Sequence, residues 1–126
     1  MTEVGILEYR LYRTGLVAVL ELPEGFASPQ QISKMRDAVR KELVDGTSTL
    51  IVDLSRCTYT NSRLLGALGE MYTSFTNING HILFAAPQQG VQGLFHLLKL
   101  DQVFEVVETV DVALARLATC HERASA

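Results

Sequence analysis

The sequence predicts an α/β fold in which a mixed, mostly parallel β-sheet is covered by about four helices. Three observations support this prediction: short apolar runs rich in valine, isoleucine and leucine, longer segments whose apolar residues recur every three or four positions, and the alternation of the two kinds. The expected order is ββαβαβαβα. Because strands separated by helices pair in parallel, only the first two strands should form an antiparallel hairpin.

Two β-like runs open the chain at residues 6–12 and 16–22, joined by a short link that contains a glycine. Both faces of the second run are apolar, which indicates a strand inside the sheet. A helix should follow. Ser28 is its expected cap, Pro29 suits its first position, and it should end near Gly46.

The second half of the sheet is expected to begin with a strand at residues 49–54, followed by a helix at 62–77. The stripe of this helix that should be buried consists of Leu65, Leu68, Tyr72 and Phe75. The remaining elements are a strand at 81–86, a helix opened by Pro87, a strand at 103–107 and a helix capped by Thr109, with residues 120–126 expected to fray.

Length and composition predict one domain over residues 1–126, with an ordered core at about 5–119. A net charge of −3 argues against nucleic-acid binding. No apolar run reaches the roughly 20 residues that span a bilayer, and the N-terminus does not resemble a signal peptide, so we expect a cytoplasmic protein without membrane insertion. Cys57 and Cys120 fit reduced thiols there.

Sequence motifs for enzymatic chemistry are missing. No glycine-rich phosphate loop is present, and His81, His96 and His121 stand apart from any metal-ligand spacing, so no cofactor or metal is expected. Asp53 ends a strand, where an α/β fold could place a catalytic carboxylate, but it could equally bond the loop that follows. We therefore expect no enzyme and assign no catalytic residue. The nearest approach to a basic cluster, Arg36 with Arg40 and Lys41, is expected to be a solvated helix face.

The most informative stretch is the apolar strand that ends in Asp53-Leu54-Ser55, with Ser62 at the start of the next helix. A serine there lies where backbone N–H groups are unpaired and the helix dipole is positive, which suits a group that will carry negative charge. The same position suits an ordinary helix cap worth about 1 kcal/mol. From the residues alone, both a phosphate switch and a cap remain open.

These motifs resemble those of the STAS family, which includes bacterial anti-sigma factor antagonists and the cytoplasmic domains of sulfate transporters. In that family a strand ending in Asp-x-Ser is followed by a polar loop and a helix start of the Asp-Ser-Ser-Gly-Leu type. Asp53-Leu54-Ser55 matches the first part, and the residues from Asn61 to Gly66 occupy the second. Asn79-Gly80 before a strand and Pro87 before a helix also look like STAS landmarks.

The resemblance implies a partner switch. An unphosphorylated antagonist binds an anti-sigma factor that is also a serine kinase; phosphorylation of the loop–helix serine ends this binding, and a serine phosphatase restores it. Ser62 is the matching position, with Ser55 and Thr60 as backup acceptors. The expected partner-binding residues are Asp53, Ser55, Thr60, Asn61, Arg63, Leu64 and Phe26. Leu64 is expected to be exposed because it lies off the buried stripe; the alternative is that it packs beneath the preceding loop. A homodimer remains open.

Several residues depart from the family pattern. Asn61 replaces the usual Asp, and Arg63 with Leu64 replaces the usual Ser-Gly pair. Phe26-Ala27 falls where many antagonists have Leu-Asp. These changes fit a divergent antagonist with its own kinase. They equally fit a STAS module that is never phosphorylated, such as an assembly subunit of a transport or signalling complex.

Overall fold

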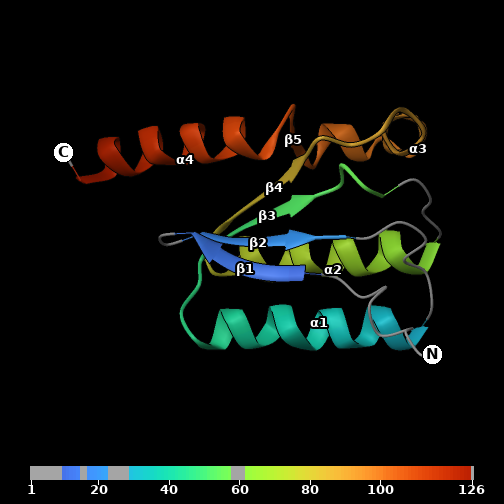
Figure 1. Cartoon of the computed structure of the whole chain (residues 1–126), viewed down its shortest axis with the longest axis horizontal. Helices are drawn as coiled ribbons and strands as arrows, with labels where there is room; N and C mark the ends of the chain where they lie inside the picture. The colour runs from blue at the N-terminus through green and yellow to red at the C-terminus, as the bar shows by residue number, and fades with distance from the viewer. Residues whose placement is uncertain (1–9, 15–16, 23–28, 58–61, 126) are drawn as a thin grey trace.

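A five-stranded sheet in the order β1-β2-β3-β4-β5 runs through the middle of the molecule (Figure 1). The structure is a computed structural model that describes residues 10–14, 17–22, 29–57 and 62–125. The strands are β1 (Arg10–Thr14), β2 (Val17–Glu21), β3 (Thr49–Asp53), β4 (His81–Ala85) and β5 (Glu105–Val107). β1 pairs antiparallel with β2, and every later pairing is parallel. The predicted mixed sheet and the order ββαβαβαβα are confirmed.

Four helices connect or follow the strands: α1 (Pro29–Val44), α2 (Ser62–Asn77), α3 (Gln89–Leu97) and α4 (Val110–Ser125). Pro29 is the first residue of α1, as expected, and Thr109 caps α4 by accepting a hydrogen bond from the N–H of Val112 at 3.0 Å. The expected cap of α1, Ser28, lies outside the described residues.

Some element boundaries differ from the prediction. α3 begins at Gln89 and not at Pro87, because Gln88 keeps an extended backbone (φ −69°, ψ 161°). The last strand begins two residues later than expected, because Leu100–Gln102 form a 3₁₀ turn and Val103 continues with helical angles. The helical backbone of α4 continues to Ser125, into the tail expected to fray; no glycine or proline interrupts it.

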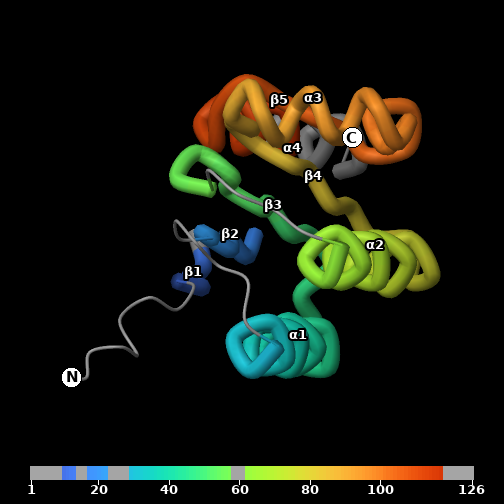
Figure 2. The backbone as a smooth tube through the Cα atoms, turned by 90° about the vertical axis from the view of Figure 1, so that its right-hand side faces the viewer, coloured from blue at the N-terminus to red at the C-terminus, as the bar shows by residue number. Residues whose placement is uncertain are grey.

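The two faces of the sheet build two apolar cores, because successive strand side chains point to opposite sides. Ala18 and Leu20 join the core that α1, α2 and α3 cover. Val17 and Val19 join the core beneath α4. β2 is therefore apolar on both faces, as its sequence predicted. Figures 1 and 2 show α1 and α2 lying side by side, with α4 on the other side of the sheet.

The expected exposure of Leu64 is wrong. Its side chain is 0% exposed and belongs to the core, whereas Leu65 is only partly buried at the margin. The inward face of α2 is centred one position earlier than predicted. Its buried residues are Leu64, Ala67, Leu68, Met71 and Phe75. Because these recur at helical spacing, α2 buries Leu64 with the other members of this face.

Gly80 allows the chain to turn tightly from α2 into β4. Its N–H bonds to the carbonyl of Phe75 at 2.7 Å, and the next N–H, of His81, bonds to the carbonyl of Ser48 at 2.8 Å. A Cβ atom at Gly80 would collide with that Ser48 oxygen. The close backbone approach therefore requires glycine here.

Candidate functional site

The carboxyl ends of the parallel strands and the amino ends of α1, α2 and α3 meet at one edge of the sheet (Figure 1). Ligands of open α/β sheets bind at such an edge, because the loops there converge while the sheet remains rigid. We call it the carboxyl edge. It holds Asp53 and Ser55 on the chain leaving β3 and Ser62 at the beginning of α2.

Asp53 shapes the turn that follows β3. Its Oδ1 accepts a hydrogen bond from the backbone N–H of Ser55 at 2.9 Å, which is an Asx turn. The N–H of Cys57 then bonds to the carbonyl of Leu54 at 3.0 Å, and the Cys57 side chain is buried. Of the two roles considered for Asp53, the structure shows the bond to the following loop. The Ser55 side chain remains exposed.

Gln88 ties this turn to the neighbouring strand connection. Its side-chain amide donates to the carbonyl of Ser55 at 2.7 Å, across 33 residues of sequence. The N–H of Leu54 bonds to the carbonyl of Ala85 at 2.9 Å and extends the contact between β3 and β4. Sequence reasoning missed Gln88. Its place directly after Pro87, at the end of an apolar strand, is the signal that could have found it.

Ser62 is the first residue of α2, and its side chain is exposed. The first N–H groups of a helix have no partner within the helix, and the macrodipole is positive there. No acidic residue lies in the first turn of α2, and the next residue is the exposed Arg63. This end of α2 is therefore a favourable place for a negative charge. The capping position falls on residue 61, which lies outside the described residues.

The structure brings together only part of the predicted site. Asp53, Ser55, Ser62 and Arg63 all lie at the carboxyl edge. Leu64 follows on α2 but is buried in the core, so it presents no side chain to a partner. The predicted residues Phe26, Thr60 and Asn61 lie outside the described residues.

Neither a metal centre nor a membrane span emerges from the part of the chain that the structure describes. That part holds no group of three metal-ligating side chains. The histidine at position 96 pairs instead with Asp101, its Nδ1 lying 3.0 Å from Oδ2. None of the described helices is long and apolar enough to cross a membrane.

A family model described as the STAS domain matches residues 26–113, well over half of the chain. The chain belongs to the STAS family. The matched region contains Asp53, Ser55 and Ser62, so the resemblance read from those motifs is confirmed at the level of the family. A comparison with curated protein sequences gives no match.

Solved structures share this STAS fold at low sequence identity. One is a Thermotoga maritima protein assigned as an anti-sigma factor antagonist. It superposes with a TM-score of 0.79 at 18% sequence identity, over 86% of this chain and 92% of its own. The Bacillus cell fate determinant SpoIIAA in its phosphorylated form gives a TM-score of 0.72 at 17% sequence identity, over 86% of this chain and 98% of its own. The murine Solute Carrier 26 family member A9 anion transporter gives a TM-score of 0.70 at 15% sequence identity, over 86% of this chain and 18% of its own.

Proposed function

We propose that this STAS domain is a partner-switching regulator of the anti-sigma factor antagonist type. In its unphosphorylated form it binds an anti-sigma factor that is also a serine kinase, and phosphorylation of Ser62 ends the binding. A serine phosphatase restores the binding form. The observation that carries the proposal is the exposed Ser62 at the amino end of α2, on the carboxyl edge of a STAS fold.

The physics of this position supports a charge switch. A phosphoserine carries roughly −1.5 to −2 charges at neutral pH, and the amino end of a helix stabilises such a charge within the monomer. The same charge inside a protein interface must lose its hydration or meet other negative charges. Phosphorylation therefore leaves the fold intact while weakening partner binding. Arg63 beside Ser62 adds a positive charge that favours the modified monomer.

The partner surface surrounds Ser62 at the carboxyl edge. Ser55 and Arg63 present exposed side chains there, and Asp53 is partly exposed. Phe26, Thr60 and Asn61 remain proposed contacts. Ser55 and Thr60 remain secondary candidates for phosphorylation. The domain acts by binding and is not proposed as an enzyme.

A second candidate function is a constitutive assembly subunit without a phosphate switch. The similarity to a domain that makes up 18% of an anion transporter favours it, since the same fold there is one part of a larger transport protein. The replacement of the usual Ser-Gly pair by Arg63 and Leu64 also favours it. This function predicts a transport protein as the bound partner and no modification of Ser62.

Two substitutions at Ser62 separate these functions. Immobilised wild-type protein should retain a serine kinase from an extract of its own cells, and Ser62→Ala should retain it equally, because the hydroxyl itself is not needed for binding. Ser62→Glu should reduce the retained kinase about tenfold or more, which corresponds to a loss of about 1.4 kcal/mol. Ser48→Glu is the matched control, since Ser48 is exposed before β3 at the opposite edge of the sheet. Equal retention by Ser62→Glu and wild type would overturn the switch.

A further inference from the structure

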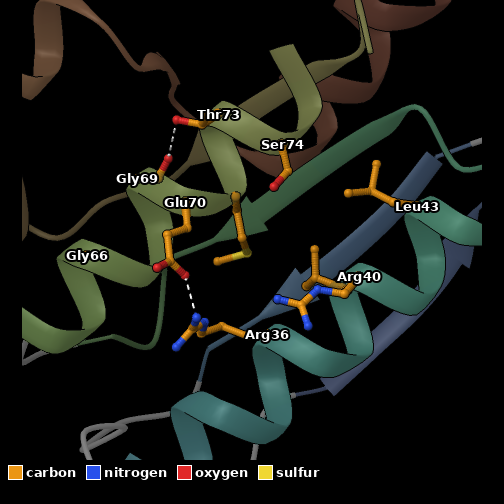
Figure 3. A pocket seen from close by; sticks show the side chains of 10 residues that line it. Arg36, Arg40, Leu43, Gly66, Gly69, Glu70, Thr73 and Ser74 are labelled. Carbon is orange, nitrogen blue, oxygen red and sulfur yellow. Dashed lines mark hydrogen bonds and ion pairs between the residues drawn. The ribbon is translucent and has the colours of Figure 1, made fainter. Parts of the chain in front are cut away.

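A groove of about 690 Å³ runs between α1 and α2, on the side of these helices that faces away from the sheet (Figure 3). Val39 and Met71 form an apolar floor and are almost fully buried. The groove is lined by Arg36, Val39, Arg40, Leu43, Gly66, Gly69, Glu70, Met71, Thr73 and Ser74. Its walls are thus a cationic face of α1 and a face of α2 built from small residues.

The two glycines of the α2 wall have no explanation within the described molecule. A Cβ atom at Gly66 or at Gly69 would meet nothing within 4 Å, and neither residue has a positive φ. Glycine in the interior of a helix nevertheless destabilises it relative to alanine. Together they leave about one turn of the outer surface of α2 without projecting side chains, which lets another backbone approach closely.

The charge of the groove is not balanced internally. Arg36 bridges to Glu70 across the groove, with 2.8 Å between Nη2 and Oε1 (Figure 3). Arg40 has only Asp37, at 3.9 Å, which is too long for a hydrogen bond, and both side chains are about 70% exposed, at 68% and 73%. Asp37 thus pairs with Arg40 only at long range and does not line the groove, so the groove itself holds two arginines, Arg36 and Arg40, against one carboxylate, that of Glu70.

The groove is continuous with the proposed switch. Ser62, Gly66, Gly69 and Thr73 follow one another at spacings of four, three and four residues, so they lie along one line on the surface of α2. A segment that covers Ser62 can therefore continue along α2 over the two glycines. From Gly66 to Thr73 this line is about 10 Å long, which matches two turns of a helix.

We propose that this groove docks an amphipathic helix of the serine kinase that phosphorylates Ser62, with an acidic side chain of that helix opposite Arg40. The inference rests on the proposed function and adds to it a recognition surface away from the phosphorylated residue. A helix fits because ridges of side chains pack into the groove between two neighbouring helices, and glycine allows the closest approach. Arg40 selects an acidic partner by charge complementarity.

The test follows Ser62 phosphorylation of the purified full chain by an extract of its own cells with radiolabelled ATP. Gly69→Leu fills the groove, and Arg40→Glu reverses its charge. Each should lower the initial labelling rate about tenfold. Gly93→Leu on α3 is the control for added bulk, because a Cβ there also meets open space, and Lys41→Glu is the control for charge. Both controls should stay within about twofold of wild type.

The outcomes distinguish the docking surface from the switch. If wild type is labelled at Ser62 and both groove variants are labelled at the same rate, the docking surface is overturned while the switch stands. If wild type acquires no phosphate on Ser62, the proposed function fails and the inference with it. If wild type alone sediments as a dimer and Gly69→Leu as a monomer, a second copy fills the groove and the kinase does not. Unchanged far-ultraviolet circular dichroism of Gly69→Leu verifies that the variant is folded.

Discussion

At the scale of single residues, two side chains define the turn beside the proposed switch. The Asp53 carboxylate accepts the N–H of Ser55, and the Gln88 amide donates to the carbonyl of the same residue. Ser55 is thereby held from both sides through its backbone, while its hydroxyl stays exposed. The turn is therefore a preorganised part of the proposed partner surface, because its backbone is fixed while the Ser55 hydroxyl stays available to a partner.

Leu64 and Leu65 are adjacent but should respond very differently to truncation. Leu64→Ala empties part of a closed core and should lower the free energy of unfolding by about 2–5 kcal/mol. Leu65→Ala should cost clearly less, because Leu65 is only partly buried. Urea unfolding of the two variants checks this. Equal losses, or a larger loss at Leu65, would show that α2 is rotated relative to the structure.

Tyr12 should make stability depend on alkaline pH. Burial raises the pKa of its phenol above the ordinary value, and the Glu21 carboxylate adds to the shift. The folded state then holds a proton that the unfolded state releases, so the stabilisation is complete below about pH 10 and is lost as the pH rises further. The free energy of unfolding should fall more steeply above about pH 10 in wild type than in Tyr12→Phe. Parallel curves for the two proteins would contradict this.

Single residues show where sequence reasoning succeeds and where it stops. The start of α2 at Ser62 was predicted, because a polar loop followed by periodic leucines marks a helix start. The burial of Leu64 was not predicted. Because Leu64 and Leu65 are adjacent, the sequence alone does not show which of the two lies on the inward face of α2. The place of Gln88 after Pro87 could mark the residue itself, but its bond to Ser55 spans 33 residues of sequence and so could not be predicted from a local pattern.

At the scale of elements, α2 combines a packed inner face with an outer face that the fold does not use. The inner face contributes Leu64, Met71 and Phe75 to the core. The outer face carries Gly66 and Gly69, which meet no neighbour at the Cβ position. The proposed docking of a partner helix accounts for these two glycines, whereas stability does not, because alanine at both positions would make a more stable helix.

Two glycine substitutions test this difference between elements. Gly69→Ala should raise the free energy of unfolding by about 0.5–1 kcal/mol, since a Cβ there meets open space in a helix. Gly80→Ala should lower it, because its Cβ would collide with the Ser48 carbonyl in the turn before β4. Thermal unfolding of both variants measures the two shifts. Shifts of the same sign would contradict the assigned roles.

Some element boundaries are set by residues within the element and could be predicted, whereas others depend on contacts between elements. The first residue of α1 and the cap of α4 could be predicted because Pro29 and Thr109 act within their own helices. The last strand was predicted too long, since Val103 has the side chain of a strand residue but follows a 3₁₀ turn. That turn brings the ring of Phe104 onto the ring of Phe84, where the two stack with 4.3 Å between their centroids. This contact forms only in the assembled fold.

At the scale of the whole molecule, the parallel sheet places the amino ends of three helices and the carboxyl ends of β2, β3 and β4 at one edge. The alternation of strands and helices predicted this arrangement, and with it the position of Ser62. The groove between α1 and α2 was not predicted, because its walls come from helices separated by β3. Of the basic residues expected to form a solvated face, Arg40 and Lys41 are exposed as expected, while Arg36 and Arg40 also line the groove.

The proposed phosphorylation switch at Ser62 is tested most directly by mass-spectrometric mapping of phosphate on the protein isolated from its own cells. The same sample should be searched for co-purifying proteins. We expect phosphate on Ser62 in a fraction of the molecules and a serine kinase bound to the remainder. An unmodified Ser62 across growth and stress conditions, with a transport protein bound in place of a kinase, would contradict it.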